Sequence, residues 1–204
     1  MYSGILVLSG PSGAGKSTII HAASDAIGEF YFSVSTTTRE PREGEINGVD
    51  YYFVSKEEFE EGIKRGEFLE YAIVHGNYYG TSLLPVKKAL SEGKLVIFDI
   101  DVQGHRLVRE AMGDIVVSAF ITPPTLNELE KRLQLRCSDL PEVIQKRIQN
   151  AKEEIKAIHE YDFVIINDTI EDAKNAFIAI ANTARYKMDK RETEKFIKMW
   201  LEGK

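Results

Sequence analysis

The sequence lacks three features that would each indicate a different class of protein. Its 204 residues include one cysteine, Cys137, which excludes an internal disulfide framework and fits a reducing compartment. No apolar run approaches the roughly eighteen residues that a membrane span needs, and the run Ile5–Leu8 is far too short for the core of a signal peptide. The formal net charge of −6 argues against a nucleic acid duplex as the main ligand. We therefore expect a cytoplasmic protein that binds neither membranes nor nucleic acids.

The composition and the order of apolar runs predict the fold class. Hydrophobic residues make up 43% of the chain and charged residues 28%, which is typical of a folded domain. Buried strands are expected at residues 4–8, 95–98, 116–121 and 163–166, and a helix is expected at residues 16–27, ending at Gly28. Strands that alternate with helical segments predict an α/β fold, in which helices cover both faces of a parallel sheet.

Two stretches depart from this alternation. Residues 33–84 contain short aromatic and polar pieces that fit a half-exposed mixed sheet, so we expect an inserted subdomain there. Residues 126–159 are rich in Glu, Lys and Arg and are interrupted near residues 137–141, which indicates two exposed helices that form a mobile lid. The core would then comprise residues 1–32, 85–125 and 160–204 of a single domain.

The end of the chain is expected to be helical and to carry an apolar stripe. Phe196, Ile197, Trp200 and Leu201 lie at helical spacing. The stripe could pack on the core or on another subunit, and we favour the core. The sequence leaves a monomer and a homodimer both open.

The most informative motif is a glycine-rich segment after the first apolar run. It matches the G-x-x-x-x-G-K-[ST] phosphate-binding loop in full and lies between a predicted strand and a predicted helix. In such a loop, Lys16 would contact the β and γ phosphates and Ser17 would supply a hydroxyl ligand for Mg²⁺. The expected triphosphate-binding residues are Gly10, Pro11, Ser12, Gly13, Ala14, Gly15, Lys16, Ser17 and Thr18. The alternative is a glycine-rich turn without a ligand, which has no need of Lys-Ser at this offset.

Two arginines indicate a second anion site. Arg39 and Arg42 are three residues apart in a loop that contains proline and glycine, so their guanidinium groups can converge on one phosphate. A monophosphate would suit them. Taken alone, such a pair is more often a set of solvated loop charges.

Three further segments together resemble guanylate kinase. They are residues 33–45, with the sequence SVSTTTREPREGE, residues 48–53, with GVDYYF, and residues 76–81, with GNYYGT. The resemblance covers nearly the whole chain. It implies the P-loop nucleoside monophosphate kinase fold, with ATP as phosphoryl donor, Mg²⁺ bound with ATP, GMP as acceptor and dGMP as a further possible acceptor.

The resemblance assigns the acceptor site to eight residues. Arg39, Arg42, Tyr51 and Tyr79 would hold the GMP phosphate, Asp101 would help to hold GMP, and Ser35, Glu70 and Thr81 would face the guanine. Glu70 is the expected base selector, because a carboxylate accepts hydrogen bonds from the adjacent N1–H and N2–H₂ donors of guanine. Without the resemblance, the two tyrosines could simply pack and Glu70 could be a solvated charge on a strand.

A pair of carboxylates follows the predicted strand at residues 95–98. Asp99 and Asp101 would lie on the same side if the backbone stays extended, at the sheet edge that borders ligands in doubly wound folds. The resemblance implies that Asp99 organises the water shell of Mg²⁺. The alternative is a hydrated strand end that caps the next helix.

The lid is expected to supply arginines. Arg132 and Arg136 share a helix face and Arg147 lies on the following helix, and the resemblance implies that these side chains close over the transferring phosphates. One departure is Cys137, which stands where the family usually has glycine and puts the local turn in doubt. The expected catalytic residues are Lys16, Arg39, Arg132, Arg136 and Arg147.

The sequence thus predicts an enzyme that transfers the γ-phosphoryl group of MgATP to GMP. The alternative from another class is a guanylate-kinase-like binding module without catalytic activity, which should have a damaged phosphate loop. A related kinase with another phosphorylated acceptor is a third possibility. The four histidines show no metal-ligand spacing, so no metal held by the protein alone is expected.

Overall fold

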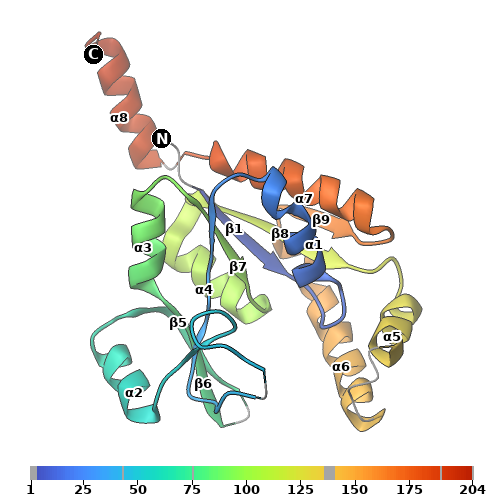
Figure 1. Cartoon of the computed structure of the whole chain (residues 1–204). Coiled ribbons are helices and arrows are strands. Elements are labelled where there is room, and N and C mark those ends of the chain that lie inside the picture. Colours follow the sequence, from blue (N-terminus) through green and yellow to red (C-terminus); the bar gives the residue numbers. More distant parts are fainter. Residues whose placement is uncertain (1–3, 43, 75, 136–140, 189, 204) are drawn as a thin grey trace.

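The chain is built on a parallel sheet whose carboxyl edge carries the predicted phosphate loop (Figure 1). The structure, a computed structural model, describes residues 4–42, 44–74, 76–135, 141–188 and 190–203. Within these ranges the main sheet has five strands, all parallel to their neighbours. Their spatial order is β2 (Phe30–Phe32), β7 (Leu95–Asp99), β1 (Ile5–Ser9), β8 (Val116–Thr122) and β9 (Phe163–Ile166).

Helices cover both faces of this sheet, as the apolar runs predict. Leu6 and Leu8 of β1 face one side, where they pack against α1 (Lys16–Ala23) and α7 (Ile170–Arg185). Ile5 and Val7 face the other side, against α3 (Leu83–Ser91) and α4 (Val102–Met112). Because both faces are buried, the central strands need apolar residues at every position rather than at alternate positions.

A second, smaller sheet occupies the predicted insertion. Its order is β4 (Tyr52–Phe53), β3 (Thr36–Thr37), β6 (Asn77–Ser82) and β5 (Phe68–Val74), with β3 parallel to β4 and antiparallel to β6. Helix α2 (Lys56–Lys64) begins with a capping box between Ser55 and Glu58. Phe59 of α2 stacks on the rings of Phe68 and Tyr78, which attaches the helix to the sheet.

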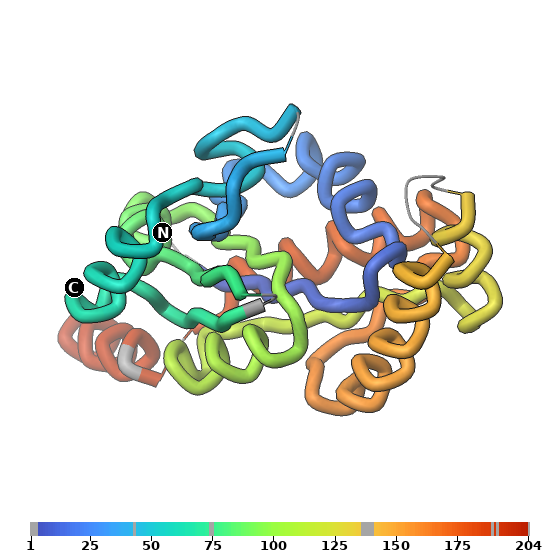
Figure 2. Tube along the Cα trace, turned by 90° about the horizontal axis from the view of Figure 1, so that it is seen from below, coloured from blue at the N-terminus to red at the C-terminus, as the bar shows by residue number. Residues whose placement is uncertain are grey.

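The predicted lid consists of α5 (Leu126–Leu135) and α6 (Pro141–Glu154), and the 3₁₀ segment η3 (Ile155–Glu160) leads back to β9. The two helices share a small apolar cluster formed by Leu129, Leu133, Ile148 and Ala151. This cluster rests on the phosphate loop, since a Cβ atom at Gly13 would lie 2.9 Å from Leu133 Cδ2. Figure 2 shows the lid helices and the second sheet at opposite ends of the molecule.

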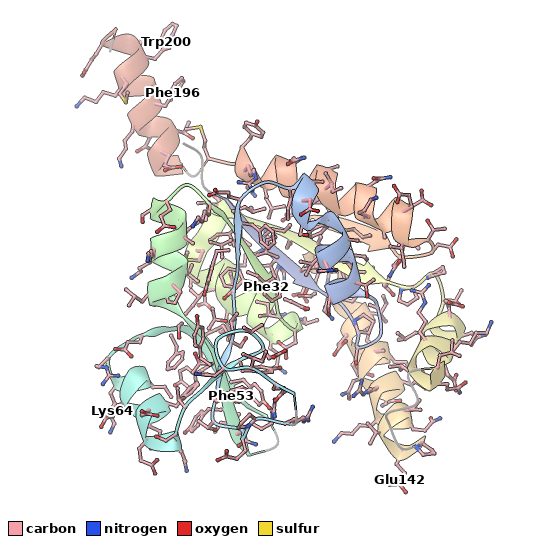
Figure 3. The ribbon with its side chains drawn as sticks, viewed as in Figure 1. Phe32, Phe53, Lys64, Glu142, Phe196 and Trp200 are labelled. Carbon is pink, nitrogen blue, oxygen red and sulfur yellow. The ribbon has the colours of Figure 1, made fainter. Side chains whose placement is uncertain are left out.

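The predicted strands and the α/β class are confirmed, and three details differ from the expectation. The apolar stripe of Phe196, Ile197, Trp200 and Leu201, which was expected to pack on the core, is exposed (Figure 3). Strand β2 was not predicted, because it is a three-residue aromatic edge strand without a long apolar run. The first helix stops at Ala23 and continues as the 3₁₀ turn η1 (Ser24–Ala26) before Gly28, whose φ is +67°. A second 3₁₀ turn, η2 (Gly113–Ile115), precedes β8, and α8 (Lys190–Leu201) is the last described helix.

In the part of the chain that the structure describes, no helix combines the length and apolarity needed to span a membrane.

Candidate functional site

The glycine-rich loop joins the end of β1 to the start of α1, which is the geometry of a phosphate cradle. Gly10 has a φ of +148°, and a Cβ atom at this position would collide with the carbonyl oxygen of Ile121 on β8. Only glycine therefore allows the loop to leave the sheet at this point. The loop then leads into the amino end of α1, where the helix dipole favours the binding of anions.

Lys16 is the first residue of α1, where the loop ends. Its Nζ donates a hydrogen bond of 2.7 Å to the Gly10 carbonyl oxygen and lies 3.7 Å from Asp99 Oδ1. Burial raises the pKa of the Asp99 carboxyl, and the nearby Lys16 ammonium opposes that rise. The Lys16 ammonium group thus lies between the loop and the carboxyl edge of β7.

The two carboxylates after β7 take different positions. Asp99 points toward Lys16, whereas Asp101 is the N-cap of α4 and its Oδ1 accepts a hydrogen bond of 2.8 Å from Gly104 N. The capping alternative is therefore correct for Asp101. Both residues nevertheless line the same pocket, so the cap does not remove Asp101 from the predicted acceptor site.

That pocket is a cavity of about 340 Å³ between the second sheet and the carboxyl edge of the main sheet. The predicted acceptor residues that line it are Ser35, Tyr51, Glu70, Tyr79 and Asp101, and Asp99, predicted for the magnesium shell, lines it too. Arg39, Arg42 and Thr81 are not among its lining residues. We call this cavity the acceptor pocket. Its volume lies at the lower end of the range usual for small-molecule sites.

Glu70 is a partly buried carboxylate of the acceptor pocket. Thr81, whose side chain is fully buried, donates a hydrogen bond of 2.7 Å to Glu70 Oε1. Burial raises the pKa of Glu70, the Thr81 hydrogen bond opposes this, and the charge of Asp101 adds to the rise. Glu70 Oε2 has no hydrogen-bond or ion-pair partner among the described residues, so it can accept from a ligand.

The arginines of the second anion site are held by a residue that the sequence analysis did not assign. Arg39 donates from one terminal nitrogen to both carboxylate oxygens of Glu45, at 2.8 and 2.9 Å, and the Glu45 carboxylate also accepts from the backbone N–H of Arg42. The Arg39 guanidinium lies 5.3 Å from the centre of the Tyr51 ring, which in turn packs edge-on against Tyr79. Arg39 is thus fixed beside Tyr51 of the pocket, while the Arg42 side chain is exposed.

The lid arginines are partly described. Arg147 of α6 donates a hydrogen bond of 2.7 Å to Ser12 Oγ, so α6 already touches the phosphate loop. Arg132 of α5 is paired with Glu128 at 3.0 Å. Arg136 and Cys137 lie outside the described residues, and the predictions made for them stay untested.

A second polar cavity adjoins the loop on the side of Arg132. It measures about 350 Å³ and is lined by Gly13, Gly15, Thr18, Arg132, Asn167, Asp168 and Ile170. Sequence analysis missed Asn167 and Asp168. The available signal was their place directly after the apolar run of β9, at the same carboxyl edge as the loop, and Asn167 Nδ2 donates to the Ala14 carbonyl oxygen at 2.7 Å. We call this cavity the loop pocket.

Glu154, at the end of α6, was also missed. It is half-buried, and burial raises the pKa of its carboxyl, with Lys16 lowering it and Asp101 raising it further. A third carboxylate therefore joins Asp99 and Asp101 around Lys16. No sequence motif marks it, because its position depends on how α6 returns to the core.

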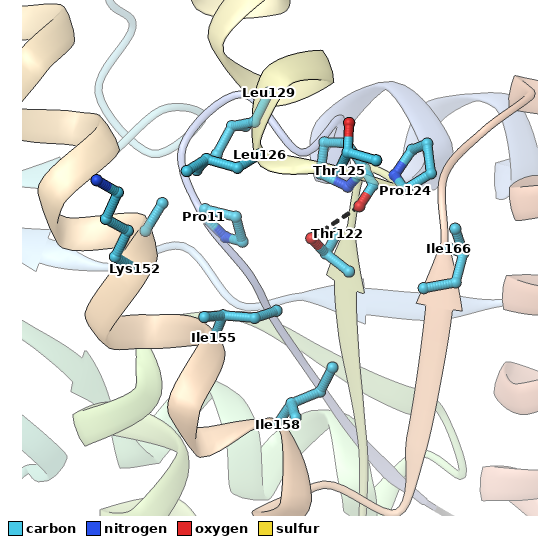
Figure 4. A pocket seen from close by; sticks show the side chains of 12 residues that line it. Pro11, Thr122, Pro124, Thr125, Leu126, Leu129, Lys152, Ile155, Ile158 and Ile166 are labelled. Atoms are coloured by element: carbon cyan, nitrogen blue, oxygen red, sulfur yellow. Dashed lines mark hydrogen bonds between the residues drawn. The ribbon is translucent and has the colours of Figure 1, made fainter.

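A third cavity, of about 340 Å³, has a different character (Figure 4). It lies where the lid joins the core and is lined mainly by apolar side chains, with Pro11, Pro124, Leu126, Ile155, Ile158 and Ile166 pointing around it. Without a convergent set of charged groups it does not suit a phosphate.

Comparisons with known proteins agree with this geometry. The family model described as Guanylate kinase matches residues 2–182. The guanylate kinase of Sulfurimonas denitrificans is 56% identical over 196 residues, which are 96% of this chain and 95% of that protein. The guanylate kinase of a Campylobacter jejuni strain is 47% identical over 204 residues, covering all of both chains. Among solved structures, guanylate kinase from Anaplasma phagocytophilum has a TM-score of 0.71 and 34% identity, covering 92% of this chain and 88% of that one. The chain belongs to the guanylate kinase family.

Proposed function

We propose that this protein transfers the γ-phosphoryl group of ATP to GMP, giving ADP and GDP. The observation that carries the proposal is the place of Asp99, which lines the acceptor pocket and lies 3.7 Å from Lys16 of the phosphate loop. One residue thus borders both nucleotide positions, as direct transfer between two bound nucleotides requires. The intact loop and the guanylate kinase relatives argue against a binding module that has lost the reaction.

On the donor side, the triphosphate would occupy the loop at residues 10–18. Lys16 would leave the Gly10 carbonyl oxygen and bind the β and γ phosphates, which offer its ammonium group a stronger partner. The purine of ATP would lie in the loop pocket, where Arg132 offers a flat cationic face and Asn167 and Asp168 offer polar groups.

On the acceptor side, GMP would bind in the subdomain of residues 33–84. Arg39, Arg42, Tyr51 and Tyr79 would hold its phosphate, and Glu70 with Ser35 and Thr81 would face its base. Glu45 prepares this site, because it fixes the Arg39 guanidinium beside Tyr51 before the ligand arrives. Glu70 would accept from both guanine donors only as a carboxylate.

The residues present fit a magnesium ion that arrives with ATP. Ser17 lies in the first turn of α1, beside the expected phosphate position, and Asp99 could reach the ion through water, which suits an ion that keeps several of its waters. The described residues contain no group of three or more acidic, histidine or cysteine side chains that could hold a metal unaided. When bound, Mg²⁺ would neutralise charge on the transferring phosphates.

Catalysis would consist of positioning and charge neutralisation. The GMP phosphate oxygen attacks the γ phosphorus in line, the bond to the β–γ bridging oxygen breaks, and ADP leaves. Arg132, Arg136 and Arg147 of the lid at residues 126–159 would close over the phosphates and exclude water. No covalent enzyme intermediate is needed.

An acceptor panel tests the proposal. ADP formation from MgATP is measured in a coupled assay with GMP, dGMP, AMP, UMP or CMP as acceptor. We expect GMP to be used far more efficiently than AMP, UMP or CMP. Equal use of AMP and GMP would refute base selection by Glu70, and ADP formation that no acceptor stimulates would refute the kinase activity itself.

A further inference from the structure

Residues 160–162 attach the end of the lid to helix α4. At this point the chain leaves η3 and enters β9, so the lid rejoins the main sheet here (Figure 1). Each of the three consecutive residues contacts one side chain of α4, and the pairs are Glu160 with Arg106, Tyr161 with His105 and Asp162 with Arg109. We call residues 160–162 the lid anchor. The proposed reaction does not yet explain these contacts.

The middle contact of the lid anchor is a buried ring stack. The ring centres of His105 and Tyr161 lie 4.1 Å apart with an angle of 20° between the planes, and only 1% and 8% of the two residues are exposed. The Tyr161 ring also packs edge-on against Phe120 of β8. Because the two rings are nearly parallel and covered by the core, the stack holds the lid anchor in one place on the sheet.

The stack lies between the elements that carry the two nucleotide sites. The backbone N–H of His105 donates a hydrogen bond of 2.9 Å to the carbonyl oxygen of Asp101, so His105 belongs to the turn of α4 that carries this acceptor residue. Burial raises the pKa of Tyr161 to about 12, and the neighbouring hydroxyl of Ser9 opposes this rise. Ser9 is the last residue of β1 before the phosphate loop. A shift of the stack would therefore disturb both sites.

The contact with Arg109 requires the neutral form of His105. Arg109 Nε donates to His105 Nε2 at 3.4 Å, and a guanidinium group can only donate. His105 Nε2 therefore accepts, and the single proton of the neutral imidazole lies on Nδ1. His105 Nδ1 is buried and has no hydrogen-bond partner among the described residues.

The charges around His105 also oppose a second proton. Burial lowers the pKa of His105, the positive charges of Arg109 and Arg106 lower it further, and the negative charges of Glu160 and Asp162 work in the other direction. Both carboxylates are already paired with these two arginines. A second proton on His105 would lie on Nε2, directly opposite the Arg109 N–H group. A charged His105 would therefore have to break the contact that holds its ring in place.

We propose that His105 is a positioning residue for phosphoryl transfer, whose neutral ring holds the lid anchor against the turn of α4 that carries Asp101. This inference rests on the proposed function. In-line transfer between two bound nucleotides is sensitive to displacements of about 1 Å. His105 does not line the acceptor pocket, and it acts through Tyr161 on the lid side and through Asp101 on the acceptor side.

The protonation of His105 can be followed in the wild-type protein. An NMR titration of the imidazole nitrogens should show the His105 proton on Nδ1 at neutral pH. The ring should stay neutral at pH values at which an ordinary histidine, with a pKa of about 6.5, is already charged. Steady-state kinetics over the same pH range should show kcat falling as His105 becomes charged. The spectrum of His105→Ala assigns the signal among the four histidines.

Two substitutions separate the ring of His105 from its charge. His105→Ala removes the stack and should lower kcat by roughly 10- to 100-fold, with smaller changes in KM for ATP and GMP, because a displacement of about 1 Å has an effect of this size. His105→Phe keeps a ring that cannot be charged, so it should recover most of the lost kcat and lack the fall of kcat that follows the His105 titration. The matched control is His21→Ala, at an exposed histidine of α1, which should behave like the wild type.

Three results would overturn the proposal. The first is a wild-type kcat in His105→Ala, and the second is a His105 signal that titrates like those of exposed histidines. Neither depends on the folding of His105→Phe. The third is a fall of kcat in His105→Phe that matches the wild type. If the wild type forms no ADP with any acceptor, the proposed function is refuted and the role in transfer with it, whereas the NMR titration still decides whether the neutral stack exists.

Discussion

Replacing Glu70 by glutamine tests how the acceptor pocket selects its base. In the wild type, a carboxylate that accepts both N1–H and N2–H₂ of guanine makes two hydrogen bonds with a charged acceptor. Glutamine keeps the shape and one acceptor oxygen, but it points an N–H₂ group at the second guanine donor. Thr81 can still donate to the remaining oxygen, so the pocket should stay intact.

The expected loss follows from the value of one such bond. A hydrogen bond to a charged group contributes about 1.5–3 kcal/mol, and 1.4 kcal/mol is about a factor of ten. Glu70→Gln should therefore lower kcat/KM for GMP by roughly 10- to 100-fold. AMP should lose less, because the glutamine amide can donate to adenine N1 and accept from its N6–H₂ group. The ratio of GMP use to AMP use should fall accordingly.

The same substitution has an opposite effect on stability. Burial raises the pKa of Glu70 above its value in the unfolded chain, so its contribution to stability is fully present at low pH and is lost as the pH rises through the folded-state pKa. Above its folded-state pKa, the ionised Glu70 destabilises the unliganded protein. Thermal unfolding should thus show Glu70→Gln at least as stable as the wild type at neutral pH, with the wild type gaining relative to the variant as the pH falls.

A matched control lies three residues earlier. Glu67 is exposed and paired with Arg65 at 2.6 Å, outside the acceptor pocket, so Glu67→Gln should leave the ratio of GMP use to AMP use unchanged. Steady-state kinetics with both acceptors measures the two ratios. A Glu70→Gln enzyme that keeps the wild-type ratio would refute the assignment of Glu70 to the guanine edge.

Three further predictions concern the loop and the lid. Lys16→Met should abolish turnover while the thermal unfolding curve stays cooperative, and residual turnover near the wild-type level would remove Lys16 from the mechanism. Gly10→Ala should lower the free energy of unfolding by about 2 kcal/mol or more, because its Cβ would collide with the Ile121 carbonyl oxygen, and urea titration measures this loss. Arg147→Ala should lower kcat by roughly 100-fold or more and change KM for GMP less, because the positive charge of Arg147 is needed most in the transition state. Equal changes in kcat and in KM would contradict a role for Arg147 in closure.

The loop and the sheet could be predicted from the sequence because each rests on a local signal. The phosphate loop has a fixed spacing of glycines and Lys-Ser, and strands buried on both faces require continuous apolar runs such as Leu95–Phe98. Strand β2 carries neither signal. It forms because the chain after Gly28 has to pass the free edge of β7, where three aromatic residues are enough to complete the sheet.

The site was predictable where motif and resemblance agreed, and less so where tertiary packing decides. Glu45 lies in the segment 33–45 that carries the resemblance, but its ion pair with Arg39 forms only because the loop folds back over six residues. Asn167, which follows β9, donates a hydrogen bond to the loop, and Glu154, at the end of α6, lies close enough to Lys16 for their charges to interact. Both residues are far from the loop in the sequence. Long-range placement of this kind leaves no fixed spacing in a single sequence.

The close approach of Leu133 to Gly13 joins helix α5 to the phosphate loop. Since the phosphate loop has no side chain at residue 13, the lid can rest its apolar cluster directly on the loop backbone. A lid exchanged between two relatives would have to match the recipient's loop at this contact as well as supply the arginines. Grafting experiments in this family should therefore treat residues 10–18 and α5 as one exchangeable unit.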